Sequence, residues 1–285
     1  MSEAHRESVA YRDIEYTVED PVAVITMNRP DNLNAFTTRM LAEIRHALGA
    51  AEKDERVVGI VLTGAGRGFC AGMDMNALND MSSGGGRGPE DLSALSAKPG
   101  NPDMGDEFTT TYAYLLAIQK PLIAAVNGAC AGLGFCFALL CDMRFVERQA
   151  KFSAAFSQRG LVAEHGASWI LPRLIGPGRA LDLLWSSRRF DGVEAEKLGL
   201  AERLCDTGDS VRSAKEYIHS LAASAAPISL KVMKQQVYRH LNMPIGESLK
   251  ETNRLMDESL KRGEFKEGVR SFIEKRPPRF PRVKG

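Results

Sequence analysis

The organisation of this chain depends on residues 122–140, which read LIAAVNGACAGLGFCFALL. Residues 122–126 form a short apolar run, which is typical of a strand buried on both faces of a parallel sheet. A glycine-rich turn follows, and residues 133–140 then predict a buried helix. Residues 121–141 carry no formal charge, and about 20 such residues can span a bilayer. The proline and the glycines divide the segment, so we predict a strand–turn–helix unit and no membrane span.

The same alternation extends toward the N-terminus. Residues 14–18 and 22–27 show an alternation of apolar and polar residues or a continuous apolar run, so they predict two strands. Residues 57–62 predict a third strand, which is buried. Residues 37–53 have the pattern of an amphipathic helix with a threonine as its N-cap. Strands alternating with helices favour an α/β fold with parallel strands and right-handed crossovers. In such sheets ligands bind beyond the carboxyl ends of the strands.

From residue 209 onward the pattern is helical. We predict four helices, at residues 211–223, 228–241, 245–261 and 265–273. We therefore divide the chain into a core, residues 1–205, and a C-terminal helical region, residues 206–285, which covers the core or joins subunits.

Residues 76–106 are rich in glycine, serine and proline. Such a composition buries too little apolar surface to order itself firmly. The segment is either a tolerated surface insertion or a mobile lid beside a site, and its position after a glycine loop favours the lid.

The composition is that of an average globular protein, with 44% hydrophobic residues among 285. Its formal charge of +1 excludes a protein that holds nucleic acid by bulk electrostatics, because that mode needs a basic excess. Five scattered cysteines without a CxxC pair, and an N-terminus without a signal peptide, favour a cytoplasmic location with no disulfide framework. Five histidines without an HExxH motif predict no metal site.

Two glycine-bearing loops that follow predicted strands form the candidate site. Residues 66–74 read GRGFCAGMD, and residues 127–134 read NGACAGLG. Glycine lets a ligand approach the main chain, and the first N–H groups of a helix have no intrahelical partner. One N–H group from each loop would form an oxyanion hole for a polarised carbonyl. The alternative is two tight turns whose glycines serve packing. Neither a Walker motif nor a GxGxxG pattern supports nucleotide binding.

Residues 68–74 resemble the FxAGxD oxyanion loop of the crotonase (enoyl-CoA hydratase/isomerase) superfamily, and residues 125–142 resemble its AxxGxxxGGG…CD segment. The likeness continues in the same order through residues 28–35, 160–176 and 272–276. This resemblance implies a crotonase-like spiral of ββα units with a C-terminal helical trimerisation region. It also implies a homotrimer or a dimer of trimers.

The ligand implied by the resemblance is an acyl-CoA thioester, so coenzyme A enters as part of the substrate and no separate cofactor is expected. The thioester oxygen would accept hydrogen bonds from the N–H groups of Met73 and Leu133. Leu133 replaces the usual glycine, but the donor is main chain. Arg29 would lie along the coenzyme, and Lys275 would approach its phosphates from a neighbouring subunit, unless Lys275 belongs to a solvated basic tail. The other implied substrate-binding positions are Leu33, Asn34, Ala35, Ala71, Gly72, Asp74, Gly132, Cys136 and Phe156. Asp74 fits a loop-fixing or helix-capping role better than that of a base.

The acid and base positions decide the chemistry. Hydratases of this family use two glutamates, and the resemblance places Cys136 and Phe156 at those positions. Neither side chain replaces a base that activates water together with an acid that protonates carbon. Glu164 occupies a third position, where family isomerases carry the carboxylate that moves a proton between the α- and γ-carbons. We expect Glu164 in a buried pocket near Phe156 and Trp169, with a surface-loop acid or a helix N-cap partner as the alternative.

We expect His165 to be structural or solvent-facing, since adjacent side chains often point apart, and Cys136 to be a small core residue. The sequence therefore predicts double-bond isomerisation through an enolate, with Glu164 as proton shuttle. The alternatives are hydration, hydrolysis or dehalogenation using Glu164, and a catalytically silent acyl-CoA-binding scaffold.

Overall fold

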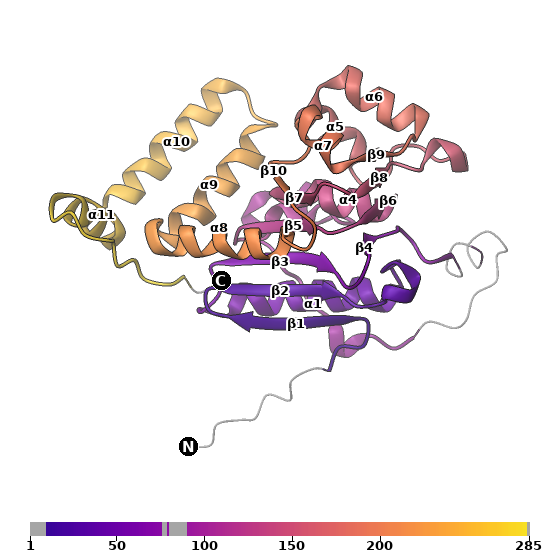
Figure 1. Ribbon diagram of the computed structural model, residues 1–285. Helices are drawn as coiled ribbons and strands as arrows, with labels where there is room; N and C mark the ends of the chain where they lie inside the picture. Colours follow the sequence, from indigo (N-terminus) through magenta and orange to yellow (C-terminus); the bar gives the residue numbers. More distant parts are fainter. Residues whose placement is uncertain (1–9, 76–78, 80–89, 284–285) are drawn as a thin grey trace.

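The computed structural model describes residues 10–75, 79 and 90–283 (Figure 1). The larger of its two sheets has six strands in the order β1–β2–β3–β5–β7–β10. β1 and β2 pair antiparallel, and the later pairings are parallel. The strands are β1 Ile14–Glu19, β2 Val22–Met27, β3 Gly59–Gly64, β5 Leu122–Val126, β7 Met143–Glu147 and β10 Arg203–Cys205. All four predicted strands are confirmed, although β3 begins two residues later than its apolar run.

The second sheet has four strands in the order β4–β6–β8–β9. These strands are β4 Gly68–Cys70, β6 Ala129–Ala131, β8 Lys151–Ser153 and β9 Phe190–Asp191. β4, β6 and β8 directly follow β3, β5 and β7 in the chain. Each successive pair therefore places its first strand in the larger sheet and its second strand in the smaller sheet. This repeated step is the spiral that the sequence predicts, and it confirms the α/β fold class.

Helices cover both faces of the larger sheet. On one face lie α1 (Thr38–Lys53) and α4 (Leu133–Leu140), whose side chains join one continuous core with alternate residues of the strands. Thr37 caps α1, accepting a hydrogen bond from the Met40 amide at 2.9 Å. Every residue of α4 is buried, which explains why its sequence is apolar all round.

The opposite face of the sheet is covered by α8 (Ser210–Ser224), through Ala214 and Ile218. A Cβ at Gly59 would lie 2.8 Å from Ile218 Cγ1, so only glycine permits this close approach. The helix is therefore part of the core, although its sequence position placed it in the C-terminal helical region. The next helix begins at Pro227 and still contacts the core, since Lys234 and Tyr238 both bind the Asp142 carboxylate. The helices after it extend away from the sheets (Figure 1).

The last three helices are α9 (Pro227–His240), α10 (Ile245–Leu260) and α11 (Gly263–Ile273), close to the predicted ranges. They bury few of their own side chains. Large apolar side chains are exposed on all three: Met233, Val237, Ile245, Leu249, Met256, Leu260, Phe265, Val269, Phe272 and Ile273. An apolar surface of this extent is typical of a protein–protein interface.

Short helices complete the chain: α3 Tyr114–Ala117, α5 Ala167–Ile175, α6 Pro177–Ser186 and α7 Gly192–Leu198, with 3-10 turns at Pro30–Asn32, Ser93–Leu95, Pro102–Met104, Asp106–Thr109 and Ser157–Arg159. Within the described residues no helix is long and apolar enough to cross a membrane.

The segment predicted as a lid, residues 76–106, lies partly outside the described residues. Its described part, residues 90–106, is packed against the core, which corrects the expectation that it cannot order itself. Leu95 and Met104 are buried, and the Gly100 amide donates to the Glu52 carboxylate of α1 at 2.7 Å.

Candidate active site

The two glycine loops meet, as the sequence predicts. Gly72 and Gly132 have φ values of +105° and +51°, which strain any other residue. A Cβ at residue 72 would lie 3.1 Å from the Ala131 oxygen and 3.6 Å from the Leu133 nitrogen. The first loop therefore runs directly past the first residue of α4.

The main-chain N–H groups of Met73 and Leu133 are both available to a ligand. Met73 forms a parallel bridge with Phe36, in which the Phe36 amide donates to Gly72 O at 2.7 Å and the Asp74 amide to Phe36 O at 3.0 Å. This pattern uses the neighbours of Met73 and leaves its own N–H on the other side. Leu133 begins α4, where N–H groups lack intrahelical partners. Neither N–H has a hydrogen-bond partner among the described residues.

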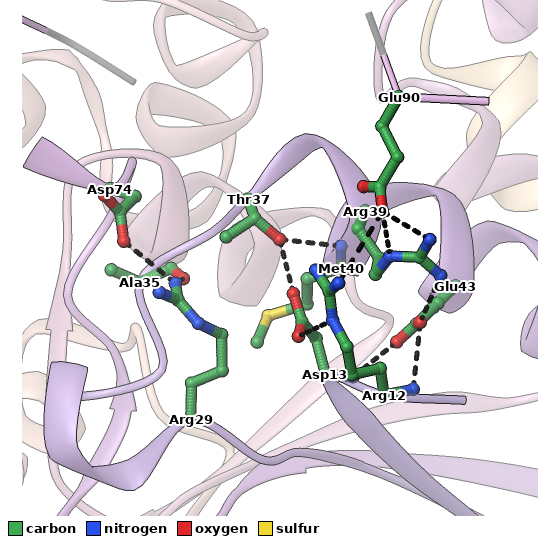
Figure 2. Close-up of polar contacts among 10 residues, drawn as sticks. All are labelled: Arg12, Asp13, Arg29, Ala35, Thr37, Arg39, Met40, Glu43, Asp74 and Glu90. Carbon is green, nitrogen blue, oxygen red and sulfur yellow. Dashed lines mark hydrogen bonds and ion pairs between the residues drawn. The ribbon is translucent and has the colours of Figure 1, made fainter. Parts of the chain in front are cut away.

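The first loop is held by residues 29–35. The buried Asn34 side chain donates to Gly68 O at 2.7 Å and to Ala65 O at 2.9 Å. Arg29 Nη1 donates to Asp74 Oδ2 at 2.9 Å and to Ala35 O at 2.6 Å, as Figure 2 shows. Asp74 thus fixes the loop, which confirms its expected role. The contact of Arg29 with coenzyme A stays a prediction, and the described contacts of this guanidinium are within the protein.

A second polar cluster fixes the start of α1, next to Phe36 (Figure 2). Thr37 Oγ1 donates to Asp13 Oδ2 at 2.6 Å, and the fully buried Glu43 carboxylate accepts from the amides of Arg12 and Asp13 at 3.0 and 2.8 Å. The cluster joins α1 to the beginning of β1. It thereby stabilises the strand segment that bridges Met73.

The other end of α4 is held by Arg144, which is almost completely buried. Its guanidinium donates to the carbonyls of Ala138, Leu139 and Cys141 at 3.2, 3.3 and 2.9 Å, and pairs with Glu202. The carbonyls at a helix C-terminus lack intrahelical donors and carry partial negative charge, so a cation satisfies both needs. Arg144 therefore fixes the helix whose first residue offers the Leu133 N–H.

Cys136 and Phe156 are both buried and provide no carboxylate. Cys136 Sγ donates to the main-chain oxygen of Glu164 at 3.7 Å, and burial raises the pKa of the thiol to about 12. The thiol is therefore protonated at neutral pH, which confirms Cys136 as a small core residue and excludes a thiolate base.

Glu164 lies in the loop before α5, beside the first turn of α4 through its contact with Cys136. Its side chain is 34% exposed, so the expectation of a buried carboxylate is wrong for the single chain. The helix-capping alternative also fails, because α5 has no side-chain N-cap bond and the main-chain oxygen of Glu164 accepts from Ala167 N. The surface-loop alternative agrees with this exposure, and the loop itself lies beside α4 through the contact of the Glu164 main-chain oxygen with Cys136.

His165 has the structural packing that we expect, but its side chain does not point away from Glu164. Its Nε2 lies 3.7 Å from Glu164 Oε2, and its ring packs edge-on against Tyr112 with centroids 5.1 Å apart. The ring lines a cavity of about 370 Å³, whose walls include Tyr112, Leu140 and Trp169. Burial lowers the pKa of His165. No spacing rule identifies this arrangement, because it depends on the positive φ of 53° at His165 itself.

The structure does not bring Lys275 to this site within one chain. Lys275 follows α11, which lies at the far end of the molecule from β4 (Figure 1). Its predicted contact with coenzyme A therefore requires a neighbouring subunit. No group of three or more metal-binding side chains occurs in residues 10–75, 79 and 90–283.

Comparison with known proteins agrees with this geometry. Residues 17–282 match the enoyl-CoA hydratase/isomerase family. The 1,2-epoxyphenylacetyl-CoA isomerase of Escherichia coli (strain K12) is 33% identical over 92% of this chain and 96% of that protein. The short-chain-enoyl-CoA hydratase of Clostridium acetobutylicum is 30% identical, over 90% of this chain and 93% of that protein. A crystal structure of an enoyl-CoA hydratase subunit from Geobacillus kaustophilus aligns with a TM-score of 0.80 and 32% identity, covering 95% of this chain and 98% of that one. The chain belongs to the enoyl-CoA hydratase/isomerase family.

Proposed function

We propose that the protein is an acyl-CoA enzyme that shifts a carbon–carbon double bond, with Glu164 as the proton shuttle. The observation that carries this proposal is the set of ionisable groups around the first turn of α4. Cys136 is a protonated thiol and Phe156 cannot ionise, so Glu164 is the carboxylate available there. One carboxylate suits a reaction that removes and returns one proton, whereas hydration uses an acid and a base.

In the proposed reaction the thioester oxygen accepts hydrogen bonds from the N–H groups of Met73 and Leu133. Glu164 takes a proton from one end of the stretch that runs from the α-carbon to the γ-carbon. The electron pair of the broken C–H bond is delocalised onto the thioester oxygen, which gives an enolate. The proton then returns at the other end, which displaces the double bond and restores the carboxylate. Each donor of such an oxyanion hole contributes about 10²–10³ in rate.

The relatives support both isomerase and hydratase chemistry. The Escherichia coli relative is named an isomerase and the Clostridium relative a hydratase, at 33% and 30% identity. Since identity at this level does not separate them, the choice rests on Cys136, Phe156 and Glu164. Five buried free thiols favour action in a reducing, cytoplasmic compartment.

The assay that tests the proposal compares a 3-enoyl-CoA with the matching 2-enoyl-CoA. We expect the enzyme to interconvert the two without forming 3-hydroxyacyl-CoA. Liquid chromatography with mass spectrometry measures all three compounds. In D₂O the product should gain deuterium only to the extent that the proton on Glu164 exchanges with solvent before it returns to the substrate. Accumulation of 3-hydroxyacyl-CoA from the 2-enoyl substrate would identify a hydratase, and tight acyl-CoA binding without turnover would identify a silent scaffold.

We also propose that α9, α10 and α11 join three copies of the chain and bring Lys275 toward a neighbour's coenzyme. Phe272, three residues before Lys275, is 86% exposed in the single chain. Phe272→Asp should therefore dissociate the assembly, because a charge would be buried among apolar side chains. Light scattering coupled to gel filtration measures this mass, and Phe272→Leu, which keeps the apolar contact, should retain the wild-type mass. A monomeric wild type would contradict the proposed assembly.

A further inference from the structure

We propose that His165 is a positioning residue for Glu164: its uncharged imidazole orients the carboxylate toward the acyl group, and protonation of the imidazole removes that carboxylate from catalysis. The inference rests on the proposed function, because it assigns a partner to the proposed base. His165 is the next residue after Glu164 in the chain. The family pattern does not include this position among its acid and base positions.

The backbone places the imidazole on the same side as the carboxylate. Adjacent residues normally point apart, but φ of 53° at His165, followed by +83° at Gly166, turns the chain so that Nε2 reaches within 3.7 Å of Glu164 Oε2. A residue other than glycine with a positive φ needs contacts that hold its backbone in this conformation. The edge-on packing of Tyr112 against the ring supplies such a contact.

The distance of 3.7 Å exceeds that of a hydrogen bond. Catalytic hydrogen bonds are often long without a ligand and shorten when the substrate is bound. An Nε2–H tautomer would then donate to one carboxylate oxygen and leave the other for proton transfer, which is how a neutral imidazole fixes a carboxylate.

The cavity beside His165 is the space that the proposal assigns to the far end of the acyl group. Leu140, on its wall, lies seven residues along α4 from Leu133, or roughly 10 Å at the helical rise. Cys136, which contacts the Glu164 main chain, is on the same helix between them. In the proposed arrangement an acyl group held at the Leu133 amide would run along α4 toward this cavity, whose wall includes His165, Leu116 and Trp169.

The burial of the imidazole and the charges around it determine the pKa of His165. Burial lowers the pKa of His165, and the Glu164 carboxylate partly opposes this effect. Tyr112 and Cys136 stay protonated at neutral pH, since burial raises the pKa of both, and Glu107 is an acidic residue on the cavity wall. His165 is therefore uncharged at neutral pH. It gains a charge, and pairs with Glu164 more strongly, as the solution becomes acidic.

The activity test compares the pH dependence of isomerisation by wild type, His165→Gln and His165→Phe. Glutamine keeps an N–H donor but does not titrate, so we expect kcat within about tenfold of wild type and an acidic limb moved to lower pH. Phenylalanine keeps the packing on Tyr112 without a donor, so kcat should fall roughly ten- to a hundredfold with KM little changed. Wild-type kcat and pH profile in both variants would show that His165 only fills space, and would overturn the inference.

A second measurement does not depend on turnover. The ring of His165 can be titrated by NMR in ¹³C-histidine-labelled full-length protein, with its signal assigned by its loss in His165→Gln. In Glu164→Gln the titration midpoint of His165 should move to lower pH, because the carboxylate that raises it is gone; an unmoved midpoint overturns the inference. Full isomerase activity of Glu164→Gln would instead overturn the proposed function.

Discussion

Glu164→Gln is expected to lower the rate of double-bond isomerisation by about 10²–10⁴-fold, the usual contribution of a positioned general base. Glutamine matches glutamate in size but cannot take a proton at neutral pH. The main-chain N–H groups of Met73 and Leu133 are unchanged, so the affinity for an unreactive acyl-CoA should stay close to that of wild type.

Stopped-flow or steady-state kinetics with a 3-enoyl-CoA measure the rate, and calorimetry with a saturated acyl-CoA measures affinity. Glu107→Gln is a matched control, because it removes one carboxylate charge from the cavity beside His165 without touching the proposed shuttle. Equal losses in the two variants would indicate a general effect of charge. An unaffected rate in Glu164→Gln would exclude Glu164 as the base.

Arg144→Met is expected to lower the free energy of unfolding by about 3–5 kcal/mol, the range for breaking a buried ion pair. Methionine fills much of the space but leaves Glu202 and the carbonyls at the end of α4 without their cation. Because α4 also carries the Leu133 N–H, isomerase activity should be lost at a lower urea concentration than in wild type.

Urea unfolding followed by circular dichroism gives this free energy, provided that folding is reversible. Arg148→Met is the matched control four residues away, since the Arg148–Asp206 pair is largely exposed and such pairs contribute about 1 kcal/mol or less. Similar losses in both variants would show that the contacts of Arg144 with α4 are not what stabilises the protein.

The strands and helices could be predicted from sequence because burial imposes a local pattern. A strand covered on both faces must be a short apolar run, and α4, buried all round, has no polar residue. The two glycine loops were also predictable, since a left-handed φ and close approach of main chains both select glycine. These features depend on residues that are neighbours in the chain.

The features that sequence did not predict depend on distant residues. Nothing within α8 shows that Ile218 faces Gly59, so the sequence alone left open whether this helix covers the core or joins subunits. The pairing of Arg144 with Glu202 joins residues 58 positions apart. For His165 the structural role was expected, but the direction of its side chain was not, because an average rule for adjacent side chains fails where the backbone adopts an unusual conformation.

The proximity of Gly72 to Leu133 makes enzymatic activity a sensitive probe of tertiary structure. The two N–H groups belong to residues 73 and 133, on separate loops, so neither loop alone would contain the proposed site. Secondary structure can survive while two docked loops separate by a few ångströms, because each is part of its own strand and helix. Activity should therefore disappear before the helical circular dichroism signal during gradual unfolding, and recover last during refolding.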